Sequence, residues 1–262
     1  MQDIYISDKG KGLPLVLIHG FLGSSRMWEP QINFFKDYYR VITPDLPGFG
    51  RSNKALSYKN INKIAKIILK CLAEKNIEKF YLMGHSMGGM IAQEIVKLVK
   101  KKIIKLICYG TGPIGNIPGR FETMEETRKN LKKNGLKNTA YRIAKTWFIE
   151  EEKSKYFYLC EEAGKSTTIG AADKALIAMK TWNGLENLKN IKNPTLIIWG
   201  DKDKAYNFNQ VETLNKNIIN SKLIVIEGCS HNAHLEKPTI FNKFFICVAK
   251  TFRSSNYTIV NE

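Results

Sequence analysis

The residues best suited to chemistry form the pentapeptide Gly84-His85-Ser86-Met87-Gly88. It follows an apolar stretch at 79–83 that is typical of a buried strand, and it precedes a helical pattern over 87–100. A serine on a tight strand-to-helix turn has crowded neighbours, and glycines two residues away on each side relieve that crowding. The first turn of the helix adds partial positive charge where an oxyanion would form. The pattern therefore predicts that Ser86 is a nucleophile for acyl transfer.

A nucleophilic serine needs a base, and the sequence contains four histidines: His19, His85, His231 and His234. His85 is fixed beside the serine on the turn, and His19 follows an early strand. The other two lie in the loop after the strand predicted at 222–226, from which a side chain can reach over the sheet edge. We favour His231 because it comes first after the small residues of that loop. His234 lies closer to the closing helix, so we expect it to pack or to cap.

The imidazole in turn needs a carboxylate that fixes its tautomer and stabilises its charged form. Asp201 and Asp203 follow the apolar stretch 194–199, so both lie at the carboxyl end of a predicted strand. Catalytic groups in open parallel sheets gather at those ends. Spacing alone leaves the choice between Asp201 and Asp203 open.

Stabilisation of an oxyanion requires two backbone N–H groups that point at one position. We expect one of them from Met87, the residue after the candidate nucleophile. The other is expected from the loop after the strand predicted at 15–18, where Phe21 is the first choice and Leu22 the alternative.

Strands and helices that alternate along the chain have to position these residues. Apolar runs predict strands at 15–18, 40–43, 79–83, 103–109, 194–199 and 222–226. Helical spacing of apolar residues predicts helices at 26–37, 60–75, 87–100 and 238–252. Such alternation is typical of βαβ units. The sequence therefore predicts an α/β fold with a mostly parallel, doubly wound sheet and helices on both faces.

The stretch 111–190 interrupts this alternation. It contains no predicted strand and three helical patterns, at 122–134, 139–149 and 171–181. It is far longer than an ordinary crossover between two strands. We therefore predict a helical cap at 111–190, inserted into a core domain formed by 1–110 and 191–262. The polar tail, 253–262, is expected to fray.

Composition excludes several classes of protein. Hydrophobic residues make up 44% of the 262 residues and charged residues 25%, so the chain can bury a core without disulfides or a structural metal. No apolar stretch approaches the ~20 residues that span a bilayer. The five cysteines lack a C-x-x-C pair, and the N-terminus lacks a signal-peptide pattern, so we expect a cytoplasmic protein. His231 and His234 are spaced like metal ligands, but no cysteine or carboxylate cluster accompanies them, so we predict no metal.

The net charge of +17, from 41 basic and 24 acidic residues, is unusually high. Such an excess favours an anionic partner, for example nucleic acid, a membrane surface or an acidic protein. Much of the excess lies in 54–105, where lysines recur between apolar residues as on a solvated helix face. Compositional bias is therefore the simpler interpretation. Because no nucleic-acid-binding motif accompanies the charge, we do not expect nucleic acid as a partner.

Five ordered motifs together resemble the α/β-hydrolase superfamily, in its compact group of esterases, lactonases and carbon–carbon bond hydrolases. The motifs are His19-Gly20-Phe21 with Gly23-Ser24, Asp45-Leu46-Pro47-Gly48-Phe49-Gly50-Arg51-Ser52, Gly84-His85-Ser86-Met87-Gly88-Gly89-Met90, Trp199-Gly200-Asp201-Lys202-Asp203, and His231 through Pro238. The resemblance implies the α/β-hydrolase fold and the chain order serine, acid, histidine. It selects Asp203, which lies three residues after the strand-ending glycine, and it supports His231. Similar proteins often have a proline shortly after the acid, whereas this chain continues Lys204-Ala205-Tyr206-Asn207.

The resemblance implies a serine hydrolase that cleaves a carboxylic ester or a related acyl compound. Ser86, His231 and Asp203 would form its triad, the N–H groups of Phe21 and Met87 would hold the oxyanion, and no cofactor is needed. Dehalogenases and epoxide hydrolases of the same fold have an aspartate where this chain has serine.

Three substrate classes are compatible with such a triad: a small-molecule ester or lactone, an acyl-carrier-protein methyl ester, and a diketone cleaved at a carbon–carbon bond. Family members that act on acyl-carrier-protein esters bind that acidic partner through basic residues of the cap. This chain offers five of them for the same purpose: Arg128, Lys129, Lys132, Lys133 and Arg142. Outside the enzyme class, the alternative is a ligand receptor on the same fold.

Overall fold

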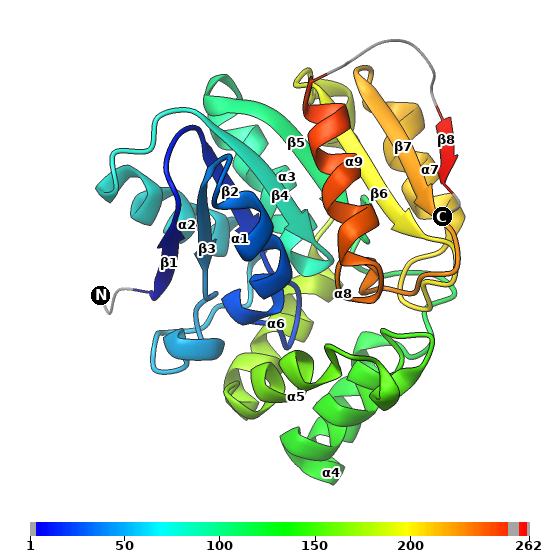
Figure 1. Ribbon diagram of the computed structural model, residues 1–262. Helices are drawn as coiled ribbons and strands as arrows, with labels where there is room; N and C mark the ends of the chain where they lie inside the picture. Colours follow the sequence, from blue (N-terminus) through cyan, green and yellow to red (C-terminus); the bar gives the residue numbers. More distant parts are fainter. Residues whose placement is uncertain (1–3, 251–256, 261–262) are drawn as a thin grey trace.

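One sheet of eight strands organises the part of the chain that the structure describes (Figure 1). The computed structural model of the protein describes residues 4–250 and 257–260. The strand order is β1-β3-β2-β4-β5-β6-β7-β8; β1 is antiparallel to β3, and every other neighbouring pair is parallel. The bounds are β1 (Ile6–Lys9), β2 (Pro14–Ile18), β3 (Arg40–Pro44), β4 (Phe80–His85), β5 (Ile103–Tyr109), β6 (Thr195–Gly200), β7 (Ser221–Ile226) and β8 (Tyr257–Val260).

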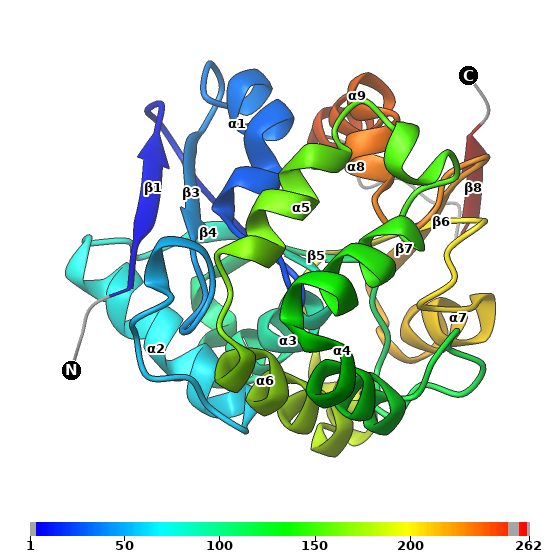
Figure 2. The same cartoon turned by 90° about the horizontal axis from the view of Figure 1, so that it is seen from below.

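Helices cover both faces of this sheet, which confirms the predicted α/β architecture. The helices α1 and α9 lie on one face, and α2, α3 and α7 lie on the other (Figures 1 and 2). The bounds are α1 (Glu29–Phe35), α2 (Ile61–Glu74), α3 (Met87–Val99), α4 (Met124–Lys145), α5 (Phe157–Lys165), α6 (Ile169–Thr181), α7 (Phe208–Asn217), α8 (Ala233–Glu236) and α9 (Pro238–Lys250). Short 3-10 helices include η1 (Ser25–Trp28) and η5 (Leu185–Asn190). Among the described helices, none combines the length and the apolarity needed to cross a bilayer.

Successive residues of the central strands point to opposite faces of the sheet and build two separate cores. In β4, Leu82 belongs to the core beneath α2 and α3, whereas its neighbour Met83 packs in the core that contains Phe245 of α9. In β2, Val16 and Leu17 divide between the two cores in the same way. Strands that are apolar on both faces read as continuous apolar runs, which is why the sequence reveals them so clearly.

The lysine-rich helix α2 shows how the positive charge is accommodated. Asn60 caps its first turn by accepting a hydrogen bond from the backbone N–H of Lys63 at 2.9 Å. The buried positions recur every three or four residues: Ile61, Ile64, Ile68 and Leu72. The lysines between them are exposed: Lys63, Lys66 and Lys70. This stretch is therefore a solvated helix face, as the sequence predicts.

Between β5 and β6 the chain forms α4, α5 and α6, which lie beyond the carboxyl ends of the strands (Figures 1 and 2). A capping box at Thr123 begins α4, and Gly135, with φ 74° and ψ 170°, interrupts it. The interruption separates the two helical stretches predicted on either side of it. The helix α5 was not predicted from the sequence. The division into a cap at 111–190 and a core of 1–110 with 191–262 stays a prediction.

Two edge strands escaped the sequence analysis. β1 contains one apolar residue, Ile6, among polar neighbours, so it lacks the apolar run that marks the inner strands. β8 pairs in parallel with β7, so the expectation that the tail frays is wrong for residues 257–260. The polar run Ser254-Ser255-Asn256 concealed this short β-branched segment. The remaining tail residues lie outside the described part of the chain, and the helix α7 was also missed.

Replacement of Leu82 by alanine should lower the free energy of unfolding by about 2–5 kcal/mol, because this side chain is fully buried in a central strand. Leu13, which is 54% exposed, provides the matched control. Leu13→Ala should change the free energy of unfolding by no more than about 0.5 kcal/mol. Urea unfolding followed by circular dichroism measures both, and equal losses would contradict the central position of β4.

Candidate active site

Ser86 lies on a tight turn between β4 and α3. Its backbone has φ 56° and ψ −119°, a positive φ that is strained for a residue with a side chain. The two flanking glycines make this turn possible. A Cβ on Gly84 would overlap the carbonyl oxygen of Gly88, and a Cβ on Gly88 would overlap that of Ile18. The strand, the helix and the glycine spacing thus present a half-buried serine at the carboxyl edge of the sheet.

His231 and Asp203 meet at the same edge, although they lie in different loops. His231 Nδ1 is 2.8 Å from Asp203 Oδ2, and the two side chains are 2% and 0% exposed. The second carboxylate oxygen, Oδ1, accepts hydrogen bonds from the backbone N–H groups of Ala205 at 2.7 Å and Tyr206 at 3.1 Å. Both oxygens of Asp203 are therefore occupied, and the carboxylate has a defined orientation.

Asp201 occupies a different position from Asp203. Its Oδ1 accepts a hydrogen bond from the backbone N–H of Gly228 at 2.7 Å, and its Oδ2 forms an ion pair with Lys202 at 2.8 Å. These contacts brace the loop after β6 against the loop after β7. Of the two candidate acids, the structure brings Asp203 to His231.

The backbone of His231 is held from below by two buried side chains. Its carbonyl oxygen accepts a hydrogen bond from the hydroxyl of Tyr109 at 2.9 Å, and His85 Nε2 lies 3.1 Å from the same oxygen. The rings of His85 and Tyr109 stack with centroids 4.5 Å apart. The sequence analysis set His85 aside as the base and missed Tyr109, because a tyrosine at the end of an apolar strand carries no pattern that distinguishes it from core.

His234 packs beneath this arrangement. It is fully buried, its Nδ1 is 2.9 Å from the hydroxyl oxygen of Tyr109, and its backbone N–H donates to that oxygen at 3.1 Å. Burial lowers the pKa of His234 to about 3, and the nearby His231 acts in the same direction. The side chain is therefore neutral and serves the packing role expected from its position.

The loop after β2 lies beside Ser86. A Cβ on Gly20 would lie 2.9 Å from the Cβ of Ser86. His19 braces this loop: its Nδ1 is 2.8 Å from the carbonyl oxygen of Gly20, and its Nε2 accepts from the N–H of Leu46 at 3.0 Å. Phe21, the first-choice oxyanion donor, follows directly.

Met87, the second expected oxyanion donor, is the first residue of α3. The first N–H groups of a helix have no partner within the helix, so they can bind a ligand. The geometry thus brings both expected donor segments next to Ser86, and the assignment of the individual N–H groups stays a prediction.

Two residues that the sequence analysis did not select also lie at the serine. Thr111 donates a hydrogen bond from its hydroxyl to the carbonyl oxygen of Ser86 at 2.9 Å. Tyr206 is 2% exposed, and its ring stacks on that of His231 with centroids 5.8 Å apart and planes at 16°. The position of Tyr206, three residues after the acid in a loop without the frequent proline, is the signal that could have found it.

The segment from Thr146 to Ile149, after α4, is bound to the loop of His231. Asn232 donates its N–H to the carbonyl oxygen of Trp147 at 3.0 Å, and the Ser230 hydroxyl donates to that of Thr146 at 3.2 Å. The carboxylate of Glu236 accepts from the N–H groups of Ile149 and Ser230, both at 2.6 Å. Burial raises the pKa of Glu236.

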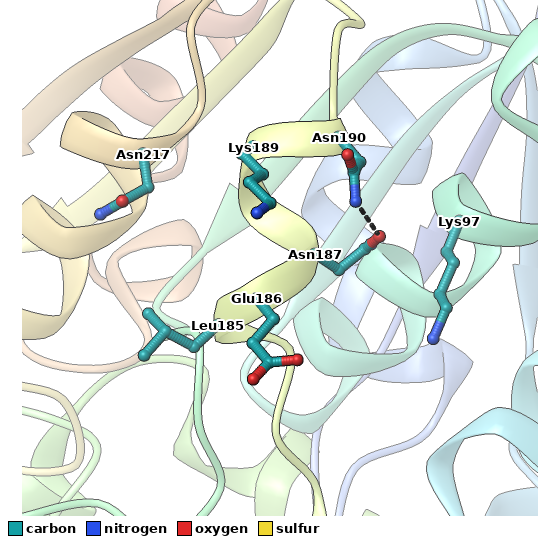
Figure 3. A pocket seen from close by; sticks show the side chains of 7 residues that line it. All are labelled: Lys97, Leu185, Glu186, Asn187, Lys189, Asn190 and Asn217. Carbon is teal, nitrogen blue, oxygen red and sulfur yellow. Dashed lines mark hydrogen bonds between the residues drawn. The ribbon is translucent and has the colours of Figure 1, made fainter.

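A surface hollow of about 750 Å³ lies at η5, away from these residues (Figure 3). Its lining comprises Lys97, Leu185, Glu186, Asn187, Lys189, Asn190 and Asn217. Asn190 Nδ2 donates to Asn187 Oδ1 at 3.4 Å within it. The hollow contains none of the residues selected for chemistry. In residues 4–250 and 257–260, no group of three or more His, Cys, Asp or Glu side chains is arranged to hold a metal ion.

Acidification should destabilise the fold, because buried histidines are neutral in it. Burial lowers the pKa of His19 and His85 as well as that of His234. A histidine with a lower pKa in the folded state stabilises the protein above its unfolded pKa, near 6.5, and loses that contribution as the pH falls toward the folded value. Between pH 8 and pH 5.5, His234 alone should reduce the free energy of unfolding by about 1 kcal/mol.

The His234→Gln variant isolates this contribution, because glutamine does not titrate. Urea unfolding at both pH values should show a smaller loss of unfolding free energy for the variant than for the wild type. An identical pH dependence of the two proteins would contradict the burial of a neutral His234.

Comparison with known proteins shows which family this chain resembles. The sequence profile of the alpha/beta hydrolase fold matches residues 14–238. The pimeloyl-[acyl-carrier protein] methyl ester esterase of Legionella pneumophila (strain Lens) is 27% identical over 244 residues, which cover 92% of this chain and 96% of that relative. The 3-oxoadipate enol-lactonase 1 of Acinetobacter baylyi is 26% identical over 251 residues, which cover 92% of this chain and 90% of that relative.

Solved structures share the fold over nearly the whole chain. An esterase from Exiguobacterium antarcticum matches with a TM-score of 0.88 at 24% identity, covering 95% of this chain and 96% of that chain. A thermophilic esterase from Thermogutta terrifontis matches with a TM-score of 0.84 at 23% identity, covering 96% and 94%. The profile match, the sheet order and the glycine-framed serine turn agree with the resemblance seen in the five sequence motifs. The chain belongs to the alpha/beta hydrolase fold family.

Proposed function

We propose that this α/β hydrolase is a serine hydrolase that cleaves a carboxylic ester or a related acyl compound through Ser86, His231 and Asp203. The observation that carries the proposal is the 2.8 Å contact between His231 Nδ1 and Asp203 Oδ2, both nearly inaccessible to water. A neutral imidazole held in this way carries its hydrogen on Nδ1, which leaves Nε2 to act as a base. The names of similar proteins, which include ester hydrolases and lactonases, support the same class of reaction.

The proposed reaction proceeds in two halves. In the first, Ser86 Oγ attacks the carbonyl carbon and its proton passes to His231 Nε2. The bond from that carbon to the leaving group then breaks, and the proton on Nε2 goes to the leaving oxygen, which departs as an alcohol. In the second half, water attacks the acyl-enzyme, gives a proton to His231, and releases the acid, while Ser86 regains its proton. The protein groups suffice for this sequence of steps without a cofactor.

The oxyanion that forms on the carbonyl oxygen is assigned to the N–H groups of Phe21 and Met87. The support for Phe21 is the approach of its loop to Ser86, and the support for Met87 is its place at the start of α3. Backbone donors fixed in advance stabilise developing charge without reorganising during the reaction.

Residues 111–190 are proposed to form the cap that determines which substrates reach the site. Support comes from their place between β5 and β6 and from the position of α4, α5 and α6 beyond the strand ends (Figure 2).

A cytoplasmic location is also proposed, because the chain has five cysteines, an odd number. No disulfide joins four of them, Cys71, Cys108, Cys160 and Cys229.

Replacement of Ser86 by alanine should reduce turnover of carboxylic esters by several orders of magnitude, because the variant lacks the attacking oxygen. Hydrolysis of p-nitrophenyl esters of increasing acyl length measures the activity. Circular dichroism serves to check that the fold is unchanged. Activity equal to that of the wild type would refute the proposed function.

Two aspartate variants provide a matched pair for this prediction. Asp203→Asn should lower kcat by up to about 10⁴-fold, because the amide favours the wrong tautomer of His231. Asp201→Asn, two residues earlier in the same loop, should retain most of the wild-type activity. Similar losses in the two variants would count against Asp203 as the acid.

An ester carried by an acidic acyl carrier protein is the second candidate substrate. The relative from Legionella pneumophila is named for such an ester. Of the five basic residues considered for docking, Arg128 forms an ion pair with Asp173 at 2.7 Å, and Arg142 forms one with Glu122 at 2.8 Å. The other three, Lys129, Lys132 and Lys133, are exposed on α4. Their charge is therefore the better support for an acidic partner.

Reversal of these three charges, in the variant Lys129→Glu/Lys132→Glu/Lys133→Glu, should lower kcat/KM for a carrier-protein ester by at least about tenfold at low salt, because steering of the acidic partner is lost. The kcat/KM for a small p-nitrophenyl ester should stay unchanged. The control reverses three other exposed lysines, Lys100, Lys101 and Lys102. If the two triple variants behave alike, α4 is not the docking surface.

A further inference from the structure

The loop after β6 holds Tyr206 rigidly at the candidate triad. Its backbone N–H donates to Asp203 Oδ1 at 3.1 Å, and its carbonyl oxygen accepts from the indole N–H of Trp199 at 2.8 Å. The same loop is tied to the segment after β5, since the N–H of Phe121 donates to the carbonyl oxygen of Lys204 at 3.2 Å. These bonds hold the backbone of Tyr206 between the loop after β6 and the segment after β5.

The side chain of Tyr206 extends along His231 toward the nucleophile. Its ring lies nearly parallel to the imidazole, with planes at 16°, and a Cβ on Gly112 would be 3.3 Å from its Cδ1. Its hydroxyl lies within reach of the side chains of Ser86 and Thr111. The hydroxyl of Thr111 donates its hydrogen bond to the carbonyl oxygen of Ser86 at 2.9 Å, so the hydroxyl oxygen can accept a hydrogen bond from Tyr206.

Tyr206 is a hydrogen-bond donor at any ordinary pH. Burial raises the pKa of its phenol, and this effect outweighs the hydrogen bonds that favour the ionised form. The hydroxyl therefore keeps its proton. Ser86 is half-buried, so part of its surface reaches solvent.

On the basis of the proposed function, we propose that Tyr206 is a further catalytic residue, which donates a hydrogen bond to the leaving-group oxygen of the ester. That oxygen and Ser86 Oγ are bonded to the same carbon in the tetrahedral intermediate, so it lies next to the position that the Tyr206 hydroxyl reaches. It must also lie at His231, which protonates it, and Tyr206 stacks on His231. The carbonyl oxygen points elsewhere, toward Phe21 and Met87.

The phenol does not transfer its proton in this step. As the carbon–oxygen bond breaks, its electron pair goes to the leaving oxygen, the proton on His231 Nε2 moves to that oxygen, and the alcohol departs. The O–H of Tyr206 rotates from Thr111 to the leaving oxygen and stabilises the partial negative charge that accumulates before the proton arrives. Hydrogen bonds to charged groups are stronger than neutral ones, so the contact gains strength in the transition state.

This role names a substrate class within the proposed function. An alkoxide leaving group of a simple alkyl ester carries much charge in the transition state and benefits strongly from a second donor. An aryloxide such as p-nitrophenolate disperses its charge over the ring and benefits little. The Tyr206 hydroxyl thus adapts the site to unactivated alkyl esters.

The test compares Tyr206→Phe with the wild type on esters of one acyl group, the one that the wild type hydrolyses fastest. The alcohols range from methanol through trifluoroethanol to p-nitrophenol. We expect kcat/KM, which reports formation of the acyl-enzyme, to fall about tenfold or more for the methyl ester and less than about threefold for the p-nitrophenyl ester. The loss should grow steadily with the pKa of the leaving alcohol.

Tyr38→Phe, which alters a tyrosine that is 60% exposed, is the matched control and should leave every rate unchanged. Thermal unfolding checks that Tyr206→Phe remains folded. A loss independent of the leaving group would assign Tyr206 a structural role only and overturn the proposal, as would no loss at all. Ser86→Ala separates the two levels: if it is inactive while Tyr206→Phe resembles the wild type, the inference fails and the proposed function stands.

Discussion

The buried contact between His231 and Asp203 is the constraint on which the rest of the site depends. The two residues are 28 positions apart in the chain and lie after β6 and β7, which pair in parallel with Ile198 opposite Ile224. Their loops meet only because parallel neighbours present their carboxyl ends at one edge. Since the two side chains are 2% and 0% exposed, a misplaced partner would leave a buried carboxylate uncompensated, which is far costlier than a lost surface hydrogen bond.

The surroundings of this pair leave it little freedom. Two backbone N–H groups donate to Oδ1 of Asp203, the oxygen that does not contact His231. The side chains of Tyr109 and His85 hold the carbonyl oxygen of His231. On the other side, the strained backbone of Ser86 is tolerated because glycines surround it and α3 begins directly after it. Strain at one residue is thus maintained by the strand, the helix and the sheet edge that pack around it.

The sequence predicts the inner strands and the serine turn well, because both depend on local patterns: apolar runs and glycine spacing. Spacing could not distinguish Asp203 from Asp201, since which carboxylate meets His231 depends on the path of the loop after β6. Tyr109 and Tyr206 were missed for a related reason, as each acts through contacts with residues distant in the chain. The edge strand β8 is too short and too polar at its start to be predicted from an apolar run. Its conformation depends on its pairing with β7.

The bonds that join Thr146, Trp147 and Ile149 to the histidine loop have a consequence for size discrimination. A ligand too large for the space beneath α4 and α5 would displace these helices. Because the segment after α4 is bonded to the loop of His231, residues 230–232 would move with them. The imidazole of His231 would then leave its position beside Asp203 while the ligand remained bound. Discrimination against large compounds would therefore lower kcat, while their binding to the enzyme would not be weakened.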